Sequence, residues 1–154
     1  MRGNSELSCF KHQIDDGSAM QQISRFHCRD QASLLRLAKE IIRVFSDRLN
    51  LRELRKLSSH AEKDKLGSNK LLQDVLAKKI GEERARQVFG PIVGAYDLRV
   101  GDAHPTSSKI GDALELAGID ESQSYLRQGE QLIHNVGYSV WCIGKLLFEE
   151  KGNP

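Results

Sequence analysis

Apolar positions recur every three or four residues through most of this chain, which is the spacing of amphipathic helices. Asp30 is placed to cap the first helix. Its apolar stripe comprises Leu34, Leu37, Ala38, Ile41, Ile42 and Phe45. A short helix is expected after Asn50, then a charged loop, "EKDKLGSN", and then a helix that Ser68 or Asn69 caps and Gly81 ends.

The second half of the pattern predicts three more helical segments. The first, in residues 82–104, should kink or restart at Pro91. Its stripe comprises Ala85, Val88, Phe89, Ile92, Val93 and Tyr96. "PTSSKIGDALELAGID" predicts a loop and a short helix, and Asp120 with Gln123 matches a capping box for a long last helix over residues 122–149. The stripe of that helix comprises Leu126, Ile133, Val136, Val140 and Leu147.

Three glycines, Gly129, Gly137 and Gly144, lie near the stripe of the last helix. Each costs about 1 kcal/mol in a helix interior. They indicate either a close approach of another helix or three tolerated glycines, and the sequence leaves both open.

The pattern therefore predicts an all-α fold, a bundle of four to five main helices. Residues 1–29 show no sustained period and form a poorly defined N-terminal segment, whereas residues 30–150 form the helical domain. A chain of 154 residues fits one domain, and it can be the carboxyl-terminal part of a longer protein.

The amino-acid composition narrows the range of possible functions only slightly. The net charge of +2 is too small to indicate nucleic-acid binding by itself, although a local basic patch can suffice. Three widely spaced cysteines favour a reducing cytoplasm over a disulfide framework, and no apolar run is long enough to span a membrane. Cys9, His12, His27 and Cys28 are metal-ligand types, but their spacing does not suit a zinc site. We expect no metal and no cofactor.

The stretch "YDLRVGDAHP", residues 96–105, carries the chemistry. His104 precedes a proline, so the helix should end there and leave the imidazole accessible. Five residues turn a straight helix by about 500°, so Arg99 and His104 do not share a face. They can converge if the helix unwinds at Gly101, or across a twofold interface.

An arginine and a histidine suffice to cleave RNA without a metal. The neutral imidazole of His104 can take the proton of a 2′-hydroxyl, and the guanidinium of Arg99 can hold the phosphate. Two structural roles compete with this interpretation. Arg99 can pair with Asp102 on the helix surface, and His104 can cap the helix C-terminus.

The segment resembles the HEPN superfamily of small helical-bundle proteins, whose mark is an arginine, four to six residues and a histidine near a helix end. Here that mark is "RVGDAH", and "YDLRVGDAH…ALELAGID…GEQLIHNVGYSV" is similar to uncharacterised bacterial HEPN-like C-terminal domains. The resemblance covers roughly residues 68–148. It implies a homodimer with a composite cleft, formed by the motif-bearing helices, and a metal-independent RNA endonuclease of a toxin or antiphage system.

The resemblance assigns catalysis to Arg99 and His104, with Asp102 orienting either one. Tyr96, Lys109 and His134 are candidate RNA-binding residues: Tyr96 for stacking, the other two for phosphate, although a core position is the simpler role for Tyr96. An antitoxin or another domain of a parent protein is a candidate partner. Active members usually carry a polar residue after the arginine, where this chain has Val100. This departure favours the alternative, a non-catalytic module that dimerises or binds RNA.

Overall fold

The computed structural model describes residues 27–60, 62–101 and 107–148, and this part of the chain is all-helical. Five of its α-helices have ten or more residues, which confirms the predicted bundle of four to five main helices. The elements are α2 (Gln31–Asp47), α3 (Leu51–Leu57), the 3-10 helix η2 (Lys63–Lys65), α4 (Ser68–Ile80), α5 (Glu82–Gly101), α6 (Ser107–Leu116) and α7 (Tyr125–Phe148).

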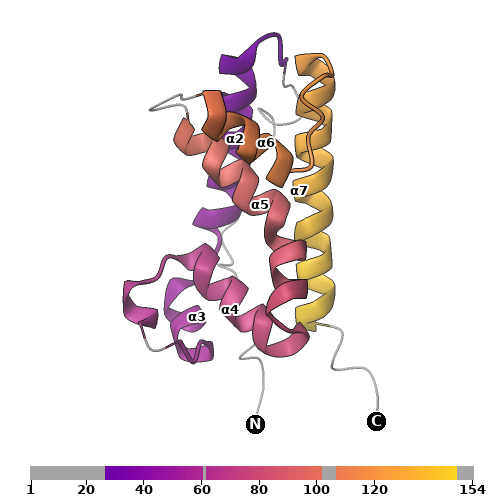
Figure 1. Ribbon diagram of the computed structural model, residues 1–154. Coiled ribbons are helices and arrows are strands. Elements are labelled where there is room, and N and C mark those ends of the chain that lie inside the picture. The colour runs from indigo at the N-terminus through magenta and orange to yellow at the C-terminus, as the bar shows by residue number, and fades with distance from the viewer. Residues whose placement is uncertain (1–26, 61, 102–106, 149–154) are drawn as a thin grey trace.

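Helix α5 lies at the centre of the bundle. It packs against α2, α4, α6 and α7, while α3 packs on α4 (Figure 1). Apolar side chains from five helices meet around it, because each amphipathic stripe must be buried against another element. The largest fully buried side chains are Leu34, Ile42, Leu54, Leu71, Leu72, Leu76, Phe89, Ile92, Leu98, Leu132 and Ile143.

The predicted cap at Asp30 is confirmed. Its carboxylate accepts a hydrogen bond from the Ser33 N–H at 2.8 Å, and the Ser33 hydroxyl accepts one from the Asp30 N–H at 3.1 Å. Asn50 also caps α3, and Gly81 ends α4 with φ of +86°, a conformation that favours glycine. These local signals were sufficient to place three helix ends.

The predicted capping box at Asp120 is wrong. Its carboxylate instead accepts bonds from the N–H and the hydroxyl of Ser122, at 3.0 and 2.6 Å, and closes a turn. Helix α7 therefore begins later, at Tyr125, and the Ser124 hydroxyl lies 3.4 Å from the Arg127 N–H in its first turn.

Pro91 does not restart α5, so that part of the prediction is wrong, while a kink at Pro91 stays a prediction. The helix runs unbroken from Glu82 to Gly101 with Pro91 inside it. Proline removes one backbone hydrogen bond. Packing of α5 against four other helices offsets that loss.

Two predicted core positions lie outside the core. Tyr96 is 42% exposed, and Leu126 at the start of α7 is exposed as well. The buried face of α7 instead runs through Leu132, Val136, Ser139, Ile143 and Leu147. The predicted stripes of α5 and α7 were therefore wrong at Tyr96 and Leu126, each of which lies near an end of its helix.

Helices α5 and α6 approach each other closely at Gly94. A Cβ atom there would stand 2.7 Å from the Ala113 carbonyl oxygen and 2.8 Å from the Ala117 Cα. At Gly137 and Gly144 of α7, by contrast, a Cβ atom would meet nothing within 4 Å. Packing among the described residues therefore explains Gly94 and leaves these two α7 glycines unexplained.

Candidate functional site

The C-terminal end of α5 presents Tyr96 and Arg99 together. They are three residues apart, so they lie on neighbouring turns of one helix face. The Arg99 guanidinium carbon lies 5.8 Å from the centroid of the Tyr96 ring, a cation–π contact. Arg99 makes no ion pair with another described residue, so its N–H groups can donate to a ligand.

Both side chains line a cavity of about 550 Å³ between α5, the start of α4 and the end of α2. This volume lies in the range of small-ligand sites. The lining residues are Ser46, Lys65, Leu66, Gly67, Ser68, Asn69, Lys70, Gln73, Phe89, Val93, Tyr96, Asp97 and Arg99. Segments about thirty positions apart in sequence thus form one site.

The start of α4 gives this cavity its positive side. The N-cap residue of α4 is Gly67, not Ser68 or Asn69 as predicted, and no side chain caps the helix. First-turn N–H groups carry partial positive charge, and Lys65 and Lys70 flank them. Lys65 also lies 3.4 Å from Glu62, but both side chains are highly exposed, so that pair is weak.

Asp97 is the anionic group of the cavity. Partial burial raises the pKa of its carboxyl above the usual 3.8, because desolvation disfavours the charged form. Asp97 forms no ion pair with another described residue that would offset this effect. The cavity therefore combines three cationic side chains, the aromatic rings of Phe89 and Tyr96, and one carboxyl, a set suited to a phosphate-bearing ligand.

The remaining predicted site residues do not join this cavity. Lys109 on α6 and His134 on α7 are both exposed, and neither lines it. Asp102 and His104 lie outside the described residues. Among the described members of the predicted set, the structure brings together Tyr96 and Arg99.

Lys65, Lys70 and Asp97 were not predicted as site residues. The one signal in the sequence was the charged segment "EKDKLGSN", which contains Lys65 and was interpreted only as a loop. Nothing in the spacing of the chain connects that segment with Arg99, because the packing of α4 on α5 makes the connection.

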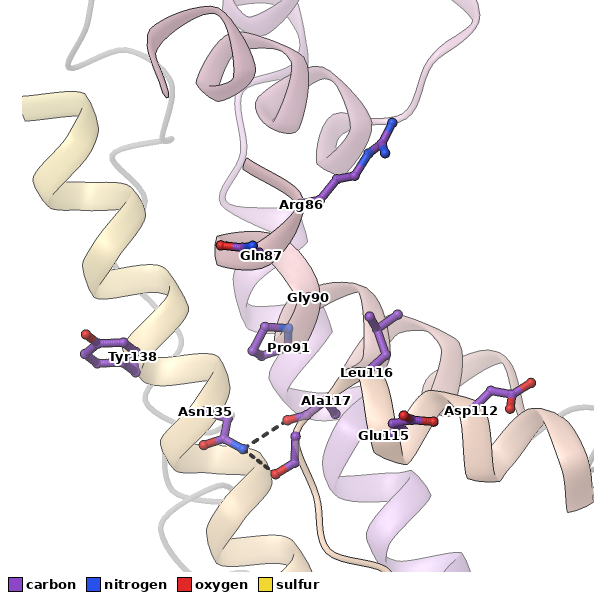
Figure 2. A pocket seen from close by; sticks show the side chains of 11 residues that line it. Arg86, Gln87, Gly90, Pro91, Asp112, Glu115, Leu116, Ala117, Asn135 and Tyr138 are labelled. Atoms are coloured by element: carbon purple, nitrogen blue, oxygen red, sulfur yellow. Dashed lines mark hydrogen bonds between the residues drawn. The ribbon is translucent and has the colours of Figure 1, made fainter. Parts of the chain in front are cut away.

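A second cavity, of about 910 Å³, opens between α5, α6 and α7 (Figure 2). Pro91 and Leu116 are apolar residues of its lining, and Arg86 and Glu115 are charged residues of its lining. Figure 2 shows the Asn135 amide reaching from α7 to the end of α6. It donates to the carbonyl oxygens of Ala117 and Gly118, at 3.0 and 2.9 Å. Asn135 thereby satisfies two backbone acceptors at the end of α6 and fixes that helix on α7.

Metal ligands do not gather in the described part of the chain. No three side chains of histidine, cysteine, aspartate or glutamate there are placed to hold an ion. Of the sequence-level zinc candidates, Cys9 and His12 lie outside the described residues, and Cys28 is buried in the core. Burial is the main reason that the pKa of the Cys28 thiol is raised, and the nearby negative charge of Asp30 raises it further.

None of the described helices combines the length and the apolar character needed to cross a bilayer. Comparison with known proteins adds no identification, since no family model, curated protein or solved structure matches this chain.

Proposed function

We propose that this chain is a HEPN-like, homodimeric RNA endonuclease that needs no metal ion. The observation that carries the proposal is the Arg99 guanidinium, stacked on Tyr96 at a cavity that Lys65 and Lys70 also line. Arginine forms paired hydrogen bonds to phosphate oxygens, and an aromatic ring can stack on a base. A single-stranded RNA supplies both groups.

In the proposed reaction the neutral imidazole of His104 takes the proton from the RNA 2′-hydroxyl. The 2′ oxygen then attacks the adjacent phosphorus, and the bond from phosphorus to the 5′ oxygen breaks as the 5′ oxygen takes up the proton from the His104 imidazolium, which then acts as general acid. Arg99 holds the two non-bridging oxygens and the charge that develops on them. Asp102 orients Arg99 or His104. The products are a 2′,3′-cyclic phosphate and a 5′-hydroxyl end.

The setting we propose is the bacterial cytoplasm, in a toxin or antiphage system, with an antitoxin or another domain of a parent protein as partner. This setting follows from the resemblance of "RVGDAH" and its surroundings to the HEPN superfamily. Lys109 is proposed to contact RNA farther along the strand, from its exposed position on α6 outside the Arg99 cavity, whereas the exposed His134 on α7 is given no RNA contact.

A second function, RNA binding or dimerisation without cleavage, is favoured by Val100. This side chain directly follows Arg99 and is 52% exposed, where a polar residue would be expected in an active enzyme. An apolar side chain there cannot hydrogen-bond to the substrate or to a catalytic group. The two functions share the Arg99 cavity and differ only in whether His104 acts on the bound RNA.

Incubation of the protein with a labelled mixed-sequence RNA in EDTA tests both proposed functions, the endonuclease and the non-catalytic module. We expect wild type to give cyclic phosphate ends, and His104→Ala and Arg99→Ala to abolish cleavage. Arg84→Ala is the matched control, because it removes the same charge from an exposed position of α5 outside the cavity. Cleavage by His104→Ala at the wild-type rate would exclude the proposed mechanism.

Binding of the same RNA separates the two functions. RNA that is bound by wild type, lost in Arg99→Ala and never cleaved would support the non-catalytic module. Equal binding by wild type and Arg99→Ala would exclude the Arg99 cavity as the RNA site.

A further inference from the structure

The outer face of α7 is apolar and aromatic, although it faces solvent. Tyr138 is 60% exposed, Trp141 is 57% exposed and Phe148 is 38% exposed. The Tyr138 and Trp141 rings stack with their centroids 5.8 Å apart, and the Lys145 ammonium lies 5.6 Å from the Trp141 centroid. Exposed aromatic clusters of this kind mark interaction surfaces.

These residues form one continuous strip. At about 100° per residue, the strip covers roughly a third of the helix circumference. Its members, in order, are Arg127, Glu130, His134, Gly137, Tyr138, Trp141, Gly144, Lys145 and Phe148. We refer to this set as the outer face of α7.

The two glycines of the outer face point to a close neighbour. A glycine weakens a helix interior, and a Cβ atom at Gly137 or Gly144 would meet nothing within 4 Å. Nothing else in the described chain needs their small size. A helix of another molecule, packed closely against α7, would need it.

We propose that the outer face of α7 binds the same face of a second copy of this chain, with the two helices antiparallel. A twofold axis between Gly137 and Tyr138 sets each Tyr138 ring against the partner's Gly137. The same axis places Trp141 opposite the partner's His134. Large and small residues thus alternate across the contact, as close helix packing requires.

The charged residues of the outer face of α7 favour a second copy of this chain as its binding partner. In the antiparallel arrangement Glu130 lies opposite the partner's Lys145, and the pair occurs twice because the interface is isologous. Glu130 is already 2.7 Å from Arg127 of its own chain, so the added cation joins an existing ion pair. An RNA strand would favour a face with cations only, whereas this face carries the Glu130 carboxylate, paired with Arg127, near one end and Lys145 near the other.

This inference takes up the homodimer of the proposed function but rests on α7 alone. It replaces the expected contact through the motif-bearing helices with a different surface. RNA cleavage can therefore fail while the α7 dimer stands, and the α7 dimer can fail while the Arg99 cavity still binds RNA.

Charge reversal of the full chain tests the pairing. Light scattering after gel filtration should give a dimer for wild type. Glu130→Lys and Lys145→Glu should each weaken it about tenfold, since each places like charges together twice. The double variant restores opposite charges and should return the dimer to near the wild-type affinity. Arg52→Glu on α3, far from the face, is the control and should leave the dimer unchanged.

Trp141 is the single tryptophan of the chain and reports on the interface directly. Its emission should shift to longer wavelength as the dimer dissociates on dilution. A monomeric wild type, or a dimer unaffected by both single reversals, would overturn the proposal. So would a monomer whose Trp141 emission shifts only when single-stranded RNA is added, which would assign the face to RNA.

Cysteine cross-linking separates α7 from the motif-bearing helix. In a chain with Cys9 and Cys142 replaced by serine and the buried Cys28 kept, Tyr138→Cys, beside the proposed twofold axis, should form a disulfide-linked dimer on mild oxidation and keeps both glycines. Val100→Cys, at the exposed end of α5, should not. Efficient cross-linking through Val100→Cys, with none through Tyr138→Cys, would place the interface on α5 and overturn the proposal.

Discussion

Gly94 of α5 and Ala117, the residue that directly follows α6, stand so close that no side chain fits between them. A Cβ atom at Gly94 would overlap the Ala117 backbone, including its nitrogen, and would lie 2.7 Å from the Ala113 carbonyl oxygen. These neighbours are backbone atoms of a packed helix and cannot turn aside. The contact fixes α6 on α5.

Gly94→Ala should therefore lower the free energy of unfolding by about 1–3 kcal/mol, because overpacking forces the two helices apart. Gly111→Ala is the control, since a Cβ atom there meets only the Glu121 carboxylate at 4.0 Å. Gly111→Ala should leave stability unchanged or raise it by up to about 1 kcal/mol. Urea denaturation of both variants measures the difference, and equal stability of the two would contradict the packing argument.

Asn135→Leu should destabilise the fold by about 1–3 kcal/mol. The variant keeps the size of the side chain but leaves the Ala117 and Gly118 carbonyl oxygens without their donor. Gln87→Leu, which removes only an exposed 3.3 Å bond to Glu83, should change stability little. Urea midpoints at an unchanged m-value test this, and a loss at Gln87 as large as that at Asn135 would argue against the capping role.

Lys70→Ala should weaken RNA binding and flatten its salt dependence. If Lys70 neutralises one phosphate, the slope of log affinity against log salt should fall by about 0.7. Arg84→Ala removes the same charge elsewhere on the surface and should keep the wild-type slope. Fluorescence anisotropy of a labelled single strand between low and moderate salt gives both slopes. An unchanged slope in Lys70→Ala would remove the start of α4 from the RNA site.

Asp97→Asn should raise RNA affinity at neutral pH and weaken its dependence on pH. The raised pKa means that the Asp97 carboxyl takes up a proton above pH 3.8, which removes a negative charge from the cavity. Wild-type affinity should therefore rise as the pH falls toward that pKa, and the variant should not show this rise. Binding titrations of both proteins at several pH values measure how much of the pH dependence of RNA affinity is due to the Asp97 carboxyl.

The same shift has a consequence for stability. The folded chain holds the Asp97 proton more tightly than the unfolded chain, so wild-type stability should fall as the pH rises from 3.8 through the folded pKa. Asp97→Asn should lack this fall. Denaturation at several pH values provides the check independently of any RNA.

Periodicity predicted the helices well, because burial of an amphipathic stripe depends mostly on local spacing. The α2 stripe from Leu34 to Phe45 is entirely buried, as expected. The helix restart predicted at Pro91 and the capping box predicted at Asp120 were wrong for opposite reasons. Tertiary packing overrode the local preference at Pro91, whereas a competing local turn through Ser122 took the Asp120 carboxylate away from the helix.

The candidate site was predictable only in part. Arg99 and Tyr96 share a helix face, so their proximity follows from a spacing of three residues. Lys65 and Lys70 come from another segment, and their position depends on how α4 packs on α5. Periodicity names the apolar side of each helix but does not fix the rotation and crossing of helix pairs, which decide the exposed neighbours.

The central position of α5 restricts how this protein can diverge. The buried positions of α5, between Ala85 and Leu98, pack against α2, α4, α6 or α7, while Tyr96, Asp97, Arg99 and Val100 near its C-terminal end are exposed. Substitutions at the buried positions disturb several interfaces at once, whereas changes at these four exposed positions leave the bundle intact. Evolution can therefore gain, lose or retune the site within one helical turn, without a compensating change in the core.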